Sequence, residues 1–300
     1  MEQPSTPPVA DRTIQTSASM ALTLVYSAPT PGTGSRYVDS PVSDRAVAHE
    51  ARVLSAAHAG EALAAHESVG ETVLRATLAS RDLAGYADPK SVGYLAPLAR
   101  AAGLGQPSDW VLRELTHSDI QPFLRALEVV GDESPLVGTL RVAAGAGKEA
   151  TLRDAMRFAA GQDSMAREYA RGFEVTRELA RPAFIGSLSR GDSARAAVVQ
   201  TFLEVLSETP DLEIGHRAGS REAEDVSRMA HGVLKAGGVH SSRGLEAIGN
   251  LDGLIRSDGR LSPTSTERPV AAAVFLVALE YGPEALAHRL RPASGGNRGR

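Results

Sequence analysis

Cysteine is absent from the 300 residues of this chain. Its absence excludes disulfide bonds, catalysis by a thiolate and metal sites with cysteine ligands. Aromatic residues are also scarce, at 4% of the chain, whereas 42% of the residues are hydrophobic. This composition predicts a globular protein whose helices pack through small aliphatic side chains.

Neither positive charge nor a long hydrophobic run stands out. The formal net charge is −4, which gives no electrostatic footprint for nucleic acid. The longest apolar run, Val270–Leu279, is much shorter than the roughly 20 residues that span a bilayer. The first residues, MEQPSTPPVADRT, lack the basic and apolar regions of a signal peptide. We therefore expect a cytoplasmic protein that binds neither nucleic acid nor membranes.

No run of alternating polar and apolar residues indicates a β-strand. General catalytic signatures are missing as well, including HExxH, GxSxG, Walker A and GxGxxG. The segment Ala143–Thr151, AAGAGKEAT, has the glycines and the lysine of a phosphate loop, but it lacks the spacing and a preceding strand. No two histidines have the i, i+4 spacing of helical metal ligands. A histidine metal site is therefore not expected.

What the chain does contain is a succession of helix signals. They predict one all-α domain of about ten helices, residues 11–290, between disordered tails at 1–10 and 291–300. The prolines and glycines of Ala28–Pro41 predict a loop. Outside the central region, the predicted helices span residues 11–27, 43–65, 68–83, 91–103, 108–115, 118–130, 220–237, 242–256 and 270–281.

The central stretch, Asp163–Gly219, is the most informative. Apolar residues at three- and four-residue steps predict a long amphipathic helix with a kink at Pro182. A second helix is predicted to begin at Asp192 or Ser193 and to end at Thr209–Pro210. A polar loop, DLEIGHRAG, follows. We expect a ligand near this loop because it presents charges of both signs, on Asp211, Glu213, His216 and Arg217.

The charged residues of this stretch also have an ordinary explanation. Glu168 and Glu174 are six residues apart and lie on different faces of a helix. Asp163–Arg167 and Glu174–Arg177 have the spacing of exposed ion pairs, worth only a few tenths of a kcal/mol. His216–Arg217 likewise fits a solvated pair at a helix end. From these residues alone, the chain is a helical domain of unknown activity.

The order of several segments along the chain is more specific than any one of them. Together they resemble the triphosphoribosyl-dephospho-CoA synthase family, particularly its archaeal-type relatives without an assigned substrate. The segments are Asp154–Thr176, Val198–Gly219, Lys235–Gly238, Leu251 with the residues after it, and Leu261–Leu276. The loop Ala28–Pro41 stands where the family carries Pro-Lys-Pro-Gly-Asn.

The resemblance implies an all-helical fold and an unusual use of ATP, in which its ribose triphosphate is transferred to a hydroxyl of dephospho-CoA and adenine leaves. It also implies Mg²⁺ with ATP as cofactor, and a small-molecule substrate. The Val270–Leu279 face is expected to serve either the core or a homodimer contact.

The matching positions supply candidate site residues. For catalysis these are Glu168, Glu174 and Asp211, and for the metal Asp39 and Glu168. Candidate substrate or phosphate ligands are Arg36, Asp39, Lys90, His216, Arg217 and Arg268. Tyr37 and Tyr169 are expected in the pocket or in the core.

Three departures from the family pattern affect charge or hydrogen bonding. The family's loop lysine and asparagine are Thr30 and Thr33 here. Its Gly-Gly-Asn-Thr-Asn segment corresponds to Ala87–Val92, which contains Lys90, and a family aspartate is replaced by Arg268. Three hypotheses follow: a transferase of this type, a diverged non-catalytic ligand-binding protein, and the same scaffold with another reaction on an anionic substrate.

Overall fold

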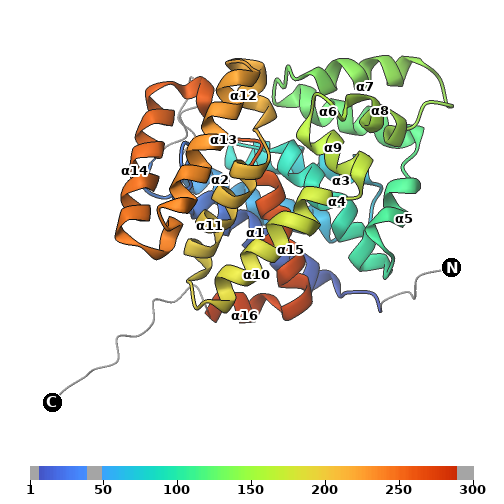
Figure 1. The fold of residues 1–300 in the computed structure, drawn as a ribbon. Helices are drawn as coiled ribbons and strands as arrows, with labels where there is room; N and C mark the ends of the chain where they lie inside the picture. The colour runs from blue at the N-terminus through green and yellow to red at the C-terminus, as the bar shows by residue number, and fades with distance from the viewer. Residues whose placement is uncertain (1–6, 39–48, 289–300) are drawn as a thin grey trace.

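The computed structural model describes residues 7–38 and 49–288, and these ranges are helical nearly throughout (Figure 1). They contain sixteen α-helices and no strand. The predicted all-α fold is therefore confirmed. There are more helices than the roughly ten predicted, because short helices lie where the sequence predicts turns or loops. No helix in the described ranges has the length and apolarity that crossing a membrane requires.

Five helices form the first third of the chain. They are α1 (Asp11–Ser27), α2 (His49–Leu63), α3 (Val69–Ala84), α4 (Pro89–Leu104) and α5 (Ser108–Arg113). The predicted cap at Ser68 is present, because its hydroxyl accepts a hydrogen bond from the Glu71 amide at 3.3 Å. Ahead of α1, the Val9 amide donates to the Ala102 carbonyl at 2.9 Å. Residues 1–6 of the first predicted tail, and all of the second tail, lie outside the described residues.

The middle of the chain folds into short helices beside α3 and α4 (Figure 1). They are η1 (His117–Asp119), α6 (Ile120–Val129), α7 (Pro135–Gly145), α8 (Leu152–Ala159) and α9 (Ser164–Arg171). The loosely phosphate-loop-like segment Ala143–Thr151 covers the end of α7 and an exposed turn.

The prediction of one long helix from Asp163 with a kink at Pro182 is wrong. Helix α9 ends at Arg171, where Gly172 and Phe173 adopt φ values of 67° and 64°. A π-helical turn, η2 (Val175–Ala180), then leads into α10 (Arg181–Ser189). Proline has no N–H to donate to the carbonyl four residues before it, and the wider π turn lies directly ahead of Pro182. The helix is interrupted before that proline, at Gly172, because glycine adopts left-handed backbone conformations without a steric cost.

The last part of the chain completes the bundle. Its elements are α11 (Ala194–Glu208), α12 (Leu212–Arg217), α13 (Ser220–Lys235), η3 (Gly238–His240), α14 (Ser242–Ser257), η4 (Gly259–Leu261), α15 (Glu267–Tyr281) and α16 (Pro283–His288). The predicted cap at Ser193 is present, with its hydroxyl accepting from the Ala196 amide at 3.2 Å. Helices α11 to α14 lie together on one side of the molecule (Figure 1).

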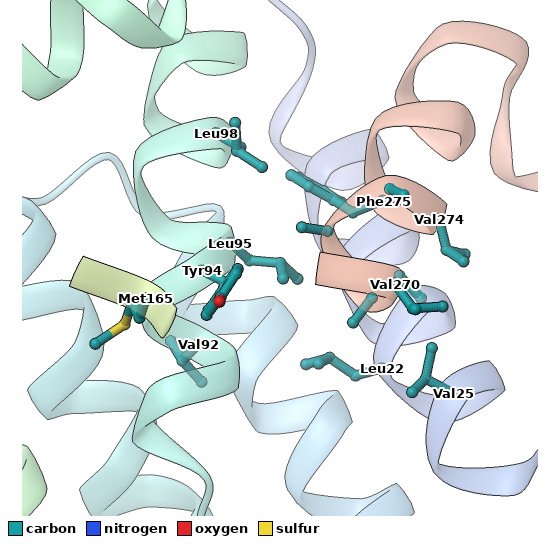
Figure 2. Close-up of a cluster of buried hydrophobic side chains, with 14 of the residues drawn as sticks. Leu22, Val25, Val92, Tyr94, Leu95, Leu98, Met165, Val270, Val274 and Phe275 are labelled. Carbon is teal, nitrogen blue, oxygen red and sulfur yellow. The ribbon is translucent and has the colours of Figure 1, made fainter. Parts of the chain in front are cut away.

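Helix α15 is the centre of the core. It packs against α1, α4, α10 and α11. Figure 2 shows Val270 and Phe275 of α15 facing Leu22 of α1 and Leu95 of α4. The apolar face of Val270–Leu279 is thus used within the chain, which decides between the core and the dimer contact that the sequence left open.

Candidate active site

The loop after α1 is fixed by contacts to residues more than 200 positions away. The Gly32 amide donates to the Asp252 carboxylate at 2.8 Å, and the Ser262 hydroxyl donates to the Gly32 carbonyl. Gly32 has φ +73°, and a Cβ there would lie 2.2 Å from the Ile255 Cγ2. Only glycine fits this position, so the loop lies close against α14 and the segment ahead of α15.

Residues 28–38, the described part of the loop, bring no charged side chain into the interior. Thr30 and Thr33 are buried, and their hydroxyl oxygens lie 2.5 Å apart. Arg36 is exposed and lies over the ring of Tyr37, 5.3 Å from its centroid. Asp39 lies outside the described residues. The loop therefore contributes backbone and hydroxyl groups in the described part of the chain.

Lys90 extends from the first turn of α4 into a group of acidic residues. Asp88 caps this helix by accepting from the Ser91 amide at 3.0 Å. The Lys90 side chain is 5% exposed, and its Nζ lies 3.2 Å from Asp163, 3.4 Å from Asp132 and 3.6 Å from Glu213. Three separate elements thus meet at one ammonium group.

The predicted polar loop Asp211–Gly219 is in fact largely helical, as α12. Asp211 is its N-cap, and one carboxylate oxygen accepts from the amides of Glu213 and Ile214 at 2.9 and 3.1 Å. The other oxygen accepts from the amide and the hydroxyl of Thr266 at 2.9 and 2.8 Å. Burial, together with the nearby Glu213 carboxylate, raises the pKa of Asp211. Asp211 joins α12 to the start of α15 through both of its oxygens.

Glu213 is the residue on which the polar groups converge. Its carboxylate accepts from Arg268 and from the Thr264 hydroxyl, and it faces Lys90. Burial alone would raise the pKa of Glu213, but the Arg268 guanidinium and the Lys90 ammonium hold it well below its usual range. Glu213 is therefore ionised at neutral pH.

Two arginines beside Glu213 keep unused N–H groups. Arg217 donates through Nε to the Glu213 carbonyl at 3.0 Å and through Nη2 to the Ser262 carbonyl, while its Nη1 is buried without a hydrogen-bond partner in the described part of the chain. The Nε of Arg268 is likewise buried without a partner. Buried N–H groups in native proteins are nearly always bonded, so these two are candidates for contact with a ligand.

Glu168 is buried, and its carboxylate caps the start of the π-helical turn η2. One oxygen accepts from the Val175 amide at 2.8 Å, and the other accepts from the amide and the hydroxyl of Thr176 at 2.9 and 2.5 Å. Burial raises the pKa of Glu168 against the effect of these donors. A cavity of about 30 Å³ lies between Glu168, Asp211 and Tyr94, which leaves room for about one water molecule. The contacts of Glu168 serve the fold of η2.

Replacing Glu168 with glutamine should lower the free energy of unfolding by about 1–3 kcal/mol, because the amide NH₂ must face an N–H group and leaves it unbonded. The Glu174→Gln variant is the control and should change stability by less than about 0.5 kcal/mol. Urea unfolding of both variants measures the difference. Equal effects would contradict the capping role of Glu168.

Several predicted site residues lie apart from this cluster. Glu174 is exposed and pairs with Arg171 at 3.1 Å, whereas Arg177 pairs with Asp109 at 3.7 Å, so the expected Glu174–Arg177 pair is wrong. His216 is exposed. The Tyr169 hydroxyl donates to the Gly93 carbonyl at 2.7 Å from within the core.

The expected ion pair between Asp163 and Arg167 is also wrong. It is buried, caps α9 by accepting from the Ala166 amide at 3.0 Å, and faces Lys90 rather than Arg167. Through Lys90, the start of α4 faces Asp163 and Glu213, and Lys90, Arg217 and Arg268 all lie around Glu213. Arg36, Glu174 and His216 lie on the surface.

A second buried ion pair was not predicted from sequence. Arg52 of α2 lies 3.2 Å from Glu267 at the start of α15 and donates to the Gly34 carbonyl at 2.8 Å. Its guanidinium carbon is 4.2 Å from the centroid of the Tyr26 ring. Burial raises the pKa of Glu267, and Arg52 opposes the rise. Nothing in the local sequence around Arg52 indicates burial. Asp132 was likewise not predicted from the sequence to be a site residue.

Comparison with known proteins gives a family for this arrangement. Residues 11–285 match the family model described as ATP:dephospho-CoA triphosphoribosyl transferase (CitG). A crystal structure from Archaeoglobus fulgidus, provisionally named triphosphoribosyl-dephospho-CoA synthase, has a similar fold. The TM-score is 0.61 at 23% identity, covering 77% of this chain and 97% of that one. A search of curated proteins finds no match.

Proposed function

Because the chain belongs to the ATP:dephospho-CoA triphosphoribosyl transferase family, we propose that it is a transferase acting on a nucleotide-like or otherwise phosphorylated small molecule. The observation that carries this proposal is the convergence at Glu213. Lys90 and Arg268 reach this carboxylate from α4 and α15, which are distant from it in sequence, and Arg217, four residues further along α12, donates to the Glu213 backbone carbonyl. Buried groups of both charges that meet in this way are common at functional sites.

The two arginines are suited to an anionic group. A guanidinium N–H bonds a phosphate oxygen more strongly than a neutral donor does, and Arg217 Nη1 and Arg268 Nε have no hydrogen-bond partner among the residues that the structure describes. Glu213 holds both side chains in place through its carboxylate and its carbonyl. In this proposal, Arg217 and Arg268 bind the phosphoryl groups and Glu213 positions them.

The described residues form no site of protein ligands alone for the Mg²⁺ that the family resemblance implies, although Mg²⁺ that arrives with a nucleotide usually takes only one or two carboxylates beside the phosphates. Mg²⁺ takes oxygen ligands at about 2.0–2.1 Å in octahedral geometry. No three acidic or histidine side chains in residues 7–38 and 49–288 are arranged to hold a metal ion. Both carboxylate oxygens of Glu168 and of Asp211 already accept hydrogen bonds. We assign these residues no metal-binding role; the other metal candidate, Asp39, lies outside the described residues.

The direct test is to incubate the protein with ATP, Mg²⁺ and dephospho-CoA and to measure free adenine by chromatography. The family reaction predicts one adenine per acceptor consumed. If no adenine is released, but ATP or inorganic triphosphate still binds in calorimetry, the family reaction is excluded and only the binding of a phosphorylated ligand is retained. Absence of both results would contradict the proposal.

Replacing Arg217 with glutamine should weaken binding of inorganic triphosphate by about 10- to 100-fold, because one charge-assisted hydrogen bond contributes about 1.5–3 kcal/mol. The neighbouring His216→Gln variant is the matched control and should bind as the wild type does, since His216 is exposed. Calorimetric titration measures both. The thermal unfolding midpoint shows whether the Arg217 variant remains folded. Equal affinity in a folded Arg217 variant would exclude it as a phosphate ligand.

One observation favours a second candidate function, a ligand-binding protein without turnover or with another reaction on an anion. Thr30 and Thr33, which replace polar family residues, bond to each other within the loop. The loop side chains there offer no charge to a phosphate. Binding of triphosphate or another anion without adenine release, lost in the Arg268→Gln variant, would support this candidate.

A further inference from the structure

The charge balance around Lys90 bears on what the acidic cluster can bind. Asp132, Asp163 and Glu213 come from a turn, a helix cap and a helix, and their oxygens surround one nitrogen at 3.2–3.6 Å. Carboxylate oxygens are the ligands that divalent cations such as Mg²⁺ and Ca²⁺ take, although these three side chains as they stand are not arranged to hold one. Here the centre is taken by an ammonium group that is itself more than nine-tenths buried.

We propose that the Lys90 ammonium is a built-in cation that occupies the position of a divalent metal ion between Asp132, Asp163 and Glu213. The inference concerns the occupant of this cluster and does not depend on the reaction proposed above. The ammonium supplies one positive charge, and the Arg268 guanidinium supplies a second at Glu213.

The geometry explains how the ammonium excludes a metal ion. Metal–oxygen distances are about 2.0–2.6 Å, shorter than the distances from Nζ to each carboxylate. The three side chains would therefore have to close by roughly 1 Å around a metal ion, and Nζ occupies the space into which they would close. Burial alone would lower the pKa of Lys90, but Asp163 and the other carboxylates raise it. The amine therefore keeps its proton, and its charge, at neutral pH.

Removing the side chain should open the site. The Lys90→Ala variant keeps the three carboxylates, loses the positive charge and leaves space at their centre. We expect it to bind one Mn²⁺ on the order of 100-fold or more tightly than the wild type, because a unit charge at this distance has a large effect in a buried site. Mn²⁺ is the probe because it accepts carboxylate ligands and its free form is measured directly by electron paramagnetic resonance.

Four proteins make the test: the wild type, Lys90→Ala, the double variant Lys90→Ala/Asp163→Asn, and Lys148→Ala as a control at an exposed lysine. Mn²⁺ should bind Lys90→Ala and raise its thermal unfolding midpoint. The double variant should lose both effects, and the wild type and Lys148→Ala should show neither.

The wild-type titration decides the proposal even where Lys90→Ala does not fold without metal. A tight Mn²⁺ site in the wild type that Asp163→Asn abolishes would overturn it, because the cluster would then hold a metal beside the lysine. A folded Lys90→Ala variant without a Mn²⁺ site would overturn it too. Adenine release is a separate readout, so failure of the proposed reaction leaves these outcomes unchanged.

Discussion

Replacing Lys90 with methionine should lower the free energy of unfolding by about 3–5 kcal/mol, one of the two largest effects expected from single substitutions in this site. Removing one partner from a buried ionic cluster costs this much because the remaining charges stay buried without compensation. Methionine keeps most of the side-chain volume, so little of the loss comes from a cavity. Denaturation in urea at neutral pH measures the change.

A second variant separates charge from packing at this position. Combining Lys90→Met with Asp163→Asn removes one positive and one negative charge, and it should recover part of the lost stability. Lys235→Met, at an exposed lysine in the last turn of α13, is the control and should stay within about 0.5 kcal/mol of the wild type. If Lys90→Met were as stable as that control, the three carboxylates would not need the ammonium.

Replacing Arg52 with methionine should have an effect of similar size, about 3–5 kcal/mol. This arginine compensates the Glu267 carboxylate, donates to the Gly34 carbonyl and stacks on Tyr26. The variant leaves Glu267 buried without its cation. The double variant Arg52→Met/Glu267→Leu removes the stranded charge and should be more stable than Arg52→Met alone.

The loss in Arg52→Met should depend on pH. Burial already raises the pKa of Glu267, so the folded protein keeps this proton to a higher pH than the unfolded chain does. Folding is therefore penalised as pH rises from about 4.3, the ordinary glutamate value, through the folded pKa. Without Arg52 the pKa rises further and the penalty grows, so the difference from wild type should be larger at pH 7 than at pH 4. A difference that is constant between these pH values would contradict this explanation.

Local sequence signals predict much of the fold because helix ends depend on short-range chemistry. The hydroxyl of Ser68 and that of Ser193 cap helices as expected. The same rule could have found α12, since Asp211 is a good cap and Glu213 a favourable first-turn residue. It was missed because six residues are too few for periodicity to show. The Asp88-Pro89 pair likewise marks the true start of α4.

The candidate site is less predictable because burial of a charge depends on the whole fold. Lys90 and Asp163 look like surface residues in their local sequence. Only the approach of α4, α9 and α12 in the folded chain brings them together. The break at Gly172 turns Glu168 into a cap for η2. The catalytic and binding roles assigned from the family resemblance remain predictions.

The start of α15 unites the polar site with the hydrophobic interior. Glu267 and Arg268 lie in its first turn, and the residues that follow are packed at the centre of the bundle. The charged groups therefore cannot move apart without disturbing this buried helix, whose amide protons should exchange with solvent only on global unfolding. In the proposed function, a rigid cluster of this kind would accept substrates that fit its preformed shape, and any adaptation to a ligand would come from the loops around it.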